Sequence, residues 1–161
     1  MLSARAIWRI ARPLAALCLV FALGLPACGH HQVRNQPPFV QVSSWQLEGQ
    51  QITANLHLRN VNDEALVING LELSLRIDLV ELSRYQAGLD RSVAANGLDT
   101  IGLEMTATED GARLLRDLEA GAMPSLPYAL EGRIRTAADQ SLPISYQGHM
   151  YRVPGRPGQF R

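Results

Sequence analysis

Two segments of the chain alternate strictly between apolar and polar residues, and this alternation limits the fold more than any other feature. Between Gln51 and Asn60 every second side chain is aliphatic, and Leu71–Leu79 repeats the pattern with five aliphatic side chains in phase. Successive side chains of a β-strand point to opposite faces. Each segment is therefore expected to be a strand with one face on a core and the other in water, as is typical of antiparallel sheets.

Weaker strand signals fill most of the chain between residues 39 and 154. We expect such strands at Val40–Leu47, Leu66–Ile68, Leu82–Ala87, Leu98–Thr106, Tyr128–Thr136 and Pro143–Val153. Turn residues separate the strands, at Glu48-Gly49, Asn62-Asp63, Asn69-Gly70, Asn96-Gly97 and Asp139. Short strands and turns at this spacing indicate a β-sandwich or a barrel.

One segment, Thr108–Gly121, follows a helical period instead. Thr108 suits the N-cap, Glu109 and Asp110 follow in the first turn, and Gly121 lies just past the end. An apolar stripe is formed by Leu114, Leu115 and Leu118. We expect one short helix at about residues 108–120, lying across an end or a face of the sandwich.

The first 27 residues have the layout of an export signal. Residues 1–12 carry three Arg and no acidic residue, and residues 14–25 are apolar and uncharged. This apolar run is short for a membrane span, which needs about 20 residues. It ends at Leu25-Pro26-Ala27-Cys28, which resembles the lipobox of bacterial lipoprotein signals, with Pro26 as a departure. The alternatives are an uncleaved anchor and an ordinary signal peptide.

The lipobox resemblance implies that residues 1–27 are removed and that Cys28 becomes the lipidated N-terminus. Gly29, in place of the Asp that retains many lipoproteins in the inner membrane, favours the outer membrane and its periplasmic face. Cys18 leaves with the signal, so no disulfide is possible in the remainder. Segment 28–38 is expected to be a lipidated Cys and a flexible tether, and Gly- and Pro-rich residues 155–161 a disordered tail.

The charge balance excludes one class of partner. The chain has 15 Arg and Lys residues against 15 Asp and Glu residues, and the signal holds three of the Arg. The remainder is therefore mildly acidic, whereas a general nucleic-acid-binding protein shows a basic excess. We expect no nucleic-acid partner.

The histidines and acidic residues give no catalytic or metal-binding pattern, so we expect no enzyme and no cofactor. His30 and His31 are adjacent but lack a spaced partner ligand, which favours a polar linker. His57 and His149 fall on the polar phase of strands, where exposure is the expectation. No Gly-x-Ser-x-Gly motif is present. First-turn and surface positions of the helix explain the acidic residues Glu109, Asp110, Asp117 and Glu119 better than a metal site.

Three further groups have structural interpretations. Asn60 and Asn62 are expected to shape a turn through side-chain to backbone hydrogen bonds. Strand aromatics that fill the sandwich and cap its rim are expected at Tyr128, Tyr146 and Tyr151, with a binding groove as the alternative. A weak basic tail, expected to be solvated rather than bound to lipid phosphates, is formed by Arg152, Arg156 and Arg161.

Four short motifs together resemble the late embryogenesis abundant type 2 family, also called the WHy (water stress and hypersensitive response) domain. They are Asn60-Val61-Asn62 for the family's Asn-Pro-Asn, Asn69-Gly70-Leu71, the Pro-Tyr-x-x-x-Gly strand at 127–132, and the closing segment 142–148 followed by Pro154. The positions that carry the resemblance are Asn60, Asn62, Gly70, Pro127, Tyr128, Gly132, Pro143 and Gly148. With the strands that lead into these motifs, the resemblance covers roughly residues 39–154. Val61 in place of Pro leaves the turn less rigid.

The resemblance implies an immunoglobulin- or fibronectin-III-like antiparallel sandwich of about seven strands with one helix, and no enzymatic activity. Members of the family are associated with desiccation, cold and other stress, and some protect client proteins. The sequence therefore predicts a non-catalytic, lipid-anchored envelope protein that acts in stress protection by weak binding of proteins or of the membrane surface. The alternatives are a carrier of lipid or of another small ligand, and an adaptor that presents an edge strand to an envelope protein complex.

Overall fold

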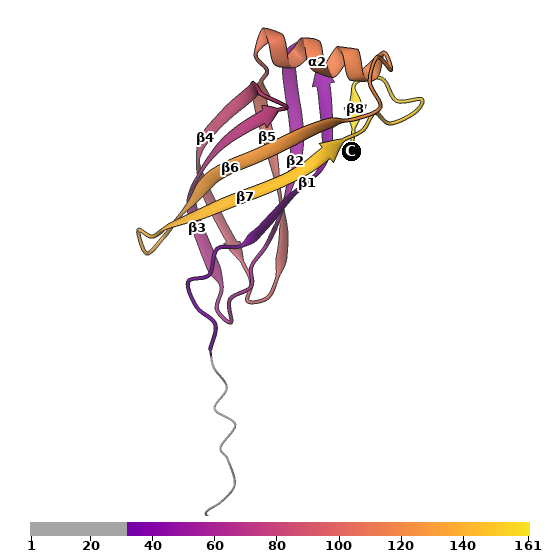
Figure 1. Cartoon of the computed structure of the whole chain (residues 1–161). Coiled ribbons are helices and arrows are strands. Elements are labelled where there is room, and N and C mark those ends of the chain that lie inside the picture. The colour runs from indigo at the N-terminus through magenta and orange to yellow at the C-terminus, as the bar shows by residue number, and fades with distance from the viewer. Residues whose placement is uncertain (1–31) are drawn as a thin grey trace, which may run out of the picture. The chain divides into compact units, whose positions relative to one another are not determined.

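Eight antiparallel strands and one helix make up the described part of the chain, residues 32–161 of a computed structural model (Figure 1). The strands are β1 (Phe39–Glu48), β2 (Gln51–Arg59), β3 (Leu66–Ile77), β4 (Val80–Val93), β5 (Leu98–Thr106), β6 (Leu126–Thr136), β7 (Ser141–Met150) and β8 (Gln159–Phe160). The helix is α2 (Glu109–Glu119). The predicted signal, Cys28, and the His30-His31 pair lie outside the described residues.

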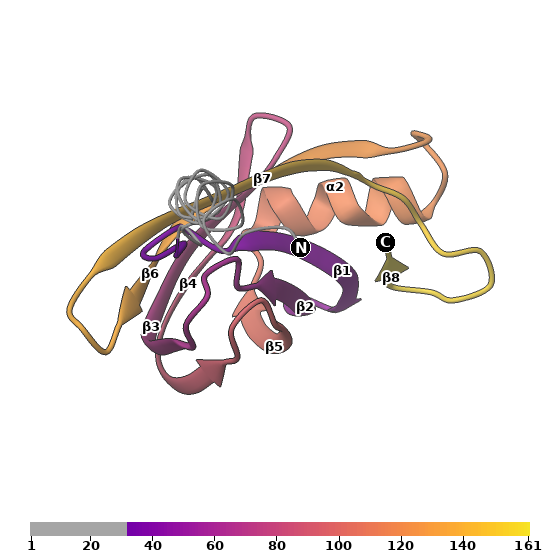
Figure 2. The same cartoon turned by 90° about the horizontal axis from the view of Figure 1, so that it is seen from below.

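The strands form two four-stranded sheets, which confirms the predicted mostly β sandwich. The first sheet has the order β5-β2-β1-β8 and the second β4-β3-β6-β7. Viewed along the strands, β5, β2 and β1 lie side by side, and β7 of the second sheet passes close to β1 (Figure 2). The short strand β8 is the addition to the expected number of about seven.

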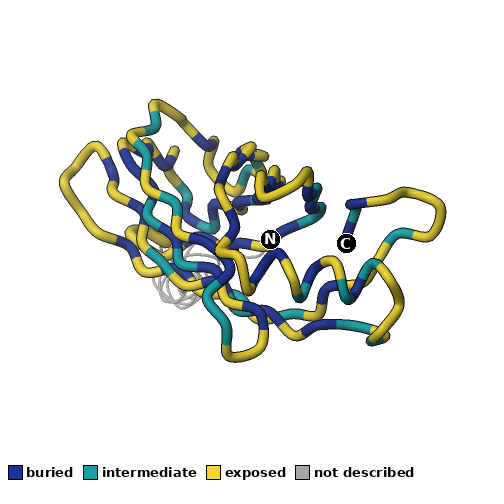
Figure 3. The backbone as a smooth tube through the Cα atoms, turned by 90° about the horizontal axis from the view of Figure 1, so that it is seen from above, coloured by how far each residue is buried: buried dark blue, intermediate teal, exposed yellow. Residues whose placement is uncertain are grey.

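The side chains between the two sheets form one continuous hydrophobic core. In Figure 3 the backbone alternates between buried and exposed positions along the strands, as period-two segments require. Leu56 and Leu58 of β2 and Leu130 and Ile134 of β6 are fully buried members of this core. Each such side chain contributes about 1.5–3 kcal/mol by leaving water.

Two β-bulges explain where the alternation in the sequence is weak. In β1 the register with β2 shifts at Ser43, so Val42 and Trp45 both point inward although they are three residues apart. In β3 a bulge at Asn69 joins the two predicted strands, Leu66–Ile68 and Leu71–Leu79, into one. The predicted turn at Asn69-Gly70 is therefore wrong.

Strand β3 also ends earlier than its aliphatic pattern predicts. Asp78 has a positive φ of 52° and turns the chain into β4. Leu79 consequently leaves the core face and is 81% exposed. The predicted turns at Gly49, Asn96 and Asp139 are confirmed, each with a positive φ at that residue.

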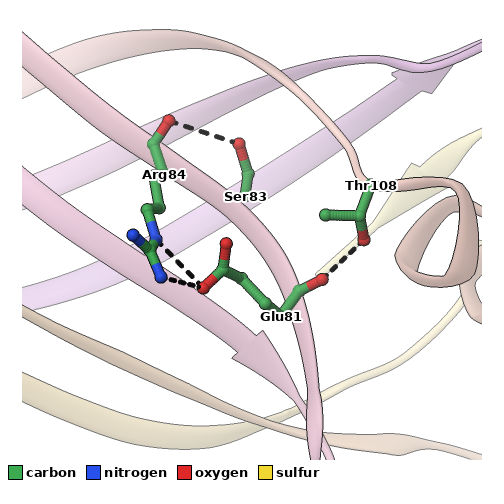
Figure 4. A network of polar contacts seen from close by, with 4 residues as sticks. All are labelled: Glu81, Ser83, Arg84 and Thr108. Atoms are coloured by element: carbon green, nitrogen blue, oxygen red, sulfur yellow. Dashed lines mark hydrogen bonds and ion pairs between the residues drawn. The ribbon is translucent and has the colours of Figure 1, made fainter.

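Helix α2 covers one end of the sandwich, which we call the helix end (Figure 1). Thr108 is its N-cap, as predicted, and accepts a hydrogen bond from the Gly111 amide at 3.1 Å. Thr108 Oγ1 also donates to the Glu81 carbonyl oxygen at 2.6 Å, which fastens the helix to the start of β4 (Figure 4). The buried face of the helix presents Ala112, Leu115 and Leu118 to the core.

The opposite end carries residues 32–38 and the loops at 60–65, 94–97 and 137–140; we call it the tether end. The prediction of a flexible tether is wrong for residues 33–38. The Val33 amide donates to Asp63 Oδ2 at 2.8 Å, the Asp63 amide donates back to the Val33 carbonyl at 3.0 Å, and Pro38 is buried. Hydrogen bonds to a loop some 30 residues away hold this segment against the sandwich.

The predicted disordered tail at 155–161 is also wrong. Phe160 is 1% exposed and pairs with Trp45 of β1. The Gly158 amide donates to Glu119 Oε1 at 2.9 Å, and the Leu47 amide donates to the Gly158 carbonyl at 2.8 Å. Burial of one aromatic ring and these backbone contacts outweigh the turn-forming Gly and Pro residues around them.

Candidate functional site

A buried asparagine pair organises the tether end. Asn60 is fully buried at the end of β2, and its Nδ2 donates to the carbonyl oxygens of Glu64, Val93 and Ala94 at 2.8, 3.2 and 3.0 Å. Its Oδ1 accepts from the backbone and side-chain nitrogens of Asn62 at 3.0 and 2.8 Å. The predicted turn at Asn60 and Asn62 is confirmed, and the Asn60 side chain also connects it to the β4–β5 loop.

Asn62 passes this connection on to the N-terminal segment. Its Oδ1 accepts from the Gln36 amide at 2.8 Å, and its Nδ2 donates to the Gln36 carbonyl at 3.0 Å. This reciprocal pair imitates the pairing of two strands. Together with the Val33–Asp63 contacts it fixes the point at which the chain joins the sandwich.

The predicted tyrosines divide between core and surface. Tyr128 is buried and packs edge-to-face against Trp45, with ring centroids 5.4 Å apart. Tyr146 is half-buried beside Tyr128, at 5.8 Å. Burial, and then the neighbouring Tyr146 phenol, raise the pKa of the Tyr128 hydroxyl above its usual value. Tyr151, just past the end of β7, is 47% exposed and does not fill the interior of the sandwich.

The glycines of the predicted motifs have different structural needs. A Cβ at Gly132 would overlap the Glu72 carbonyl oxygen of the adjacent strand β3. A Cβ at Gly148 would lie 3.0 Å from ring atoms of Tyr128 and Tyr146. Gly70, by contrast, has room for a side chain, because the nearest atoms to its Cβ position are at ordinary contact distance.

The two prolines of the motifs lie on the outer face of the second sheet and are exposed. The Pro127 carbonyl accepts from the Asp78 amide at 2.9 Å and so joins the turn between β3 and β4 to the start of β6. Pro143 lies in β7, an edge strand, where a residue without an N–H is tolerated. The motif positions thus form the asparagine pair at the tether end and the aromatic and glycine contacts of the second sheet, and they do not converge on one cavity.

The candidate histidines and acids are dispersed. His57 is half-buried on the outer face of the first sheet, and His149 is exposed on the second. Of the helix acids, Asp110 pairs with Arg113 at 2.8 Å and Glu119 accepts from the Gly158 amide. Within residues 32–161 no three or more His, Cys, Asp and Glu side chains are grouped so as to hold a metal ion.

Polar contacts beside the helix end were not foreseen from the sequence. Ser83, 2% exposed, donates to the Thr106 carbonyl at 2.9 Å. The Arg84 guanidinium binds the Glu81 carboxylate at 2.8 Å (Figure 4). The first bond ties β4 to the end of β5 at the base of α2, and the second lies within β4. Arg152 donates to the Glu119 carbonyl at 3.5 Å, so this residue of the basic tail lies at the helix end.

Sequence reasoning also missed an exposed row on the first sheet at the tether end. Phe39, Arg59 and Leu98 are direct cross-strand partners on β1, β2 and β5. Phe39 is 71% exposed and Leu98 is 64% exposed. Both are large apolar residues on the polar phase of their strands, and that exception to the alternation was the available signal.

Solved structures of other proteins share this fold. The solution structure of AT1g01470 from Arabidopsis thaliana matches with a TM-score of 0.59 at 12% identity, over 83% of this chain and 93% of that one. Weaker matches are a solution structure of a candidate late embryogenesis abundant (LEA) protein (TM-score 0.45, 14% identity, 96% and 91% covered) and a protein from Archaeoglobus fulgidus (0.44, 13%, 71% and 95%). At such identities the likeness concerns the fold alone.

No protein-family model and no curated protein matches the chain. Among the described residues, no helix is both long and apolar enough to cross a membrane.

Proposed function

We propose that this chain is a non-catalytic lipoprotein of the bacterial envelope, anchored through Cys28 in the outer membrane and facing the periplasm. Its sandwich acts in stress protection by weak surface contacts with client proteins or with the membrane. The anchor rests on the lipobox at residues 25–28, and the stress role rests on the motif resemblance together with the mostly β sandwich fold.

The observation that carries the proposal is the attachment at the tether end. Val33, only five residues after Cys28, is hydrogen-bonded in both directions to Asp63. Gln36 is held in the same way by Asn62. A sandwich fastened this close to a lipidated residue is suited to work at a membrane surface rather than at a distance from it.

The interior supports surface contacts over an internal ligand site. The space between the sheets is filled by one hydrophobic core, and within residues 32–161 every buried side-chain nitrogen and oxygen has a hydrogen-bond partner. A hollow at the tether end, lined by Leu66 and Leu142 among others, measures about 220 Å³. A second hollow at the same end measures about 380 Å³, but both are open to solvent and lie outside the packed core. Ligand pockets bury most of the ligand surface, so the carrier alternative gains no support from these hollows.

A protection assay tests the stress role. Residues 28–161 with Cys28→Ser are mixed with a heat- or freeze-sensitive enzyme, and light scattering and recovered activity are measured. We expect protection by the folded protein and none by a Gly132→Val variant, in which the added side chain collides with β3. Serum albumin at equal mass controls for crowding. Equal recovery with the folded protein and with albumin would refute the protective role.

A further inference from the structure

The distance from the proposed anchor to the sandwich is short. Cys28 and Val33 are five residues apart, and an extended chain spans at most about 3.6 Å per residue, so the two lie within about 18 Å of each other. Val33 is fixed to the sandwich by Asp63. With Cys28 lipidated, the tether end therefore stays close to the membrane. The helix end is separated from the tether end by one strand length, roughly 30 Å for nine residues.

The exposed apolar residues of the first sheet lie at this same end. Phe39 and Leu98 flank Arg59 in one cross-strand row, on the outer face and in the rim position of their strands. The next outward-facing row of the sheet, Gln41, His57 and Thr100, is polar. Apolar exposure on this face is thus confined to the edge that the anchor holds near the membrane.

The charge of the row fits an anionic headgroup. Arg59 is exposed, and within residues 32–161 it makes no ion pair. The nearby acid Glu64 is paired with Arg34 at 2.8 Å, and Asp99 accepts from the Thr100 amide at 2.8 Å. The guanidinium of Arg59 therefore keeps its donors for an external acceptor, and Arg suits phosphate oxygens.

A shallow hollow of about 380 Å³ adjoins the row and is lined by Phe39, His57, Arg59, Leu98 and Tyr146 among others. Its lining combines apolar side chains with the donors of His57 and Arg59. This combination matches the boundary between the phosphates and the acyl chains of a phospholipid layer, where aromatic and aliphatic side chains enter and basic side chains bind phosphate.

We propose that the row Phe39–Arg59–Leu98 is a phospholipid-contact surface that lays the tether end on the membrane carrying the anchor. Phe39 and Leu98 enter the headgroup layer, and Arg59 binds a lipid phosphate. This proposal rests on the proposed anchoring through Cys28. Because the tether holds the row at high local concentration near the lipid, the contact needs little affinity of its own.

The test replaces biological lipidation by a chemical tether, so that it does not depend on the cell's processing. Residues 28–161, in which Cys28 is the only cysteine, are coupled to a maleimide phospholipid in vesicles of phosphatidylethanolamine and phosphatidylglycerol. Benzoylphenylalanine is placed at position 98 or, as the matched control, at 104. Both positions lie on the exposed phase of β5. The two labelled proteins are prepared and tested in separate samples.

We expect lipid crosslinks at position 98 on the order of tenfold above those at 104, because six residues of strand separate the two positions by about 20 Å. An Arg59→Glu change is expected to lower the yield at 98, and Arg76→Glu, on the outer face of the second sheet, is not. Equal yields at 98 and 104, or crosslinks between protein copies in place of lipid, would overturn the proposal. Lipidation itself is tested separately, by the mass of the protein made in cells.

Discussion

Replacing Asn60 by alanine is expected to destabilise the sandwich strongly although no apolar contact of note is lost. The amide of Asn60 gives two N–H groups to three carbonyl oxygens and accepts two hydrogen bonds from Asn62. It is fully buried, so water cannot replace these partners. Counting each of the two N–H groups once and the two accepted bonds, about 1 kcal/mol apiece gives a loss of about 4 kcal/mol of unfolding free energy.

For a domain of this size, about 3–4 °C of melting temperature corresponds to each kcal/mol, so the melting temperature is expected to fall by about 12–16 °C. Urea unfolding followed by Trp45 fluorescence gives the free energy directly, because Trp45 is buried in the core. Asn55→Ala is the matched control. Asn55 lies on β2, the strand that leads into Asn60, but it is exposed, and within residues 32–161 its side chain makes one hydrogen bond, to Ser44.

The control is expected to change the stability by less than about 0.5 kcal/mol. Hydrogen exchange adds a local reading, since the amide of Gln36 depends on Asn62 and through it on Asn60. That amide is expected to lose protection in Asn60→Ala and to keep it in Asn55→Ala. If the two variants were equally stable, the tether end would not be held by the asparagine pair, and the reasoning from burial and hydrogen bonding would fail.

Three further predictions follow from single contacts. Gly132→Ala is expected to lower the unfolding free energy by about 3 kcal/mol, because the added Cβ collides with a neighbouring backbone. Gly102→Ala, with open space at its Cβ position, is expected to be near neutral in the same urea titration. Phe160→Ala is expected to lower the unfolding free energy, measured by thermal unfolding, by about 3–5 kcal/mol. Phe39→Ala, at an exposed position, is expected to lower it by less than about 0.5 kcal/mol. Similar losses in the two variants would contradict the packing of the C-terminal strand. The pKa of Tyr128 is raised in the folded state, so the protonated phenol stabilises the fold fully below the unfolded pKa of about 10, and this contribution declines as the pH rises beyond that value. Tyr128→Phe is therefore expected to flatten the fall of the unfolding free energy with pH in alkaline solution. An unchanged dependence on pH would contradict the pKa shift.

The sequence predicted those parts of the fold that depend on local pattern. The alternation in Gln51–Asn60 became β2, and the cap and stripe of residues 108–120 became α2. The bulges at Ser43 and Asn69 could not be predicted, because a bulge is defined by the register with a partner strand that lies elsewhere in the chain.

The same reason explains the two wrong predictions at the ends of the sandwich. Residues 33–38 have the composition of a linker, but their partners Asn62 and Asp63 lie 26 and 30 residues away. Phe160 stands among Gly and Pro residues, and its partner Trp45 lies on the first strand. Composition describes the local preference of a segment and does not reveal a distant partner.

The candidate site was predicted in part. Asn60 and Asn62 were expected to form a turn and do so, while the bonds of Asn60 to the β4–β5 loop required the structure. The exposed pair Phe39 and Leu98 was visible as an exception to the alternation, yet only the strand register shows that Arg59 lies between them.

The anchor at Cys28 is tested most directly by the intact mass of the protein purified from the membranes of a Gram-negative bacterium. We predict a chain that begins at Cys28 and carries the added mass of a diacylglyceryl group, with the Cys28→Ser variant unprocessed and free of lipid. A protein that retains residues 1–27, or that begins at Cys28 without added lipid, would contradict the anchoring and the role at the membrane derived from it.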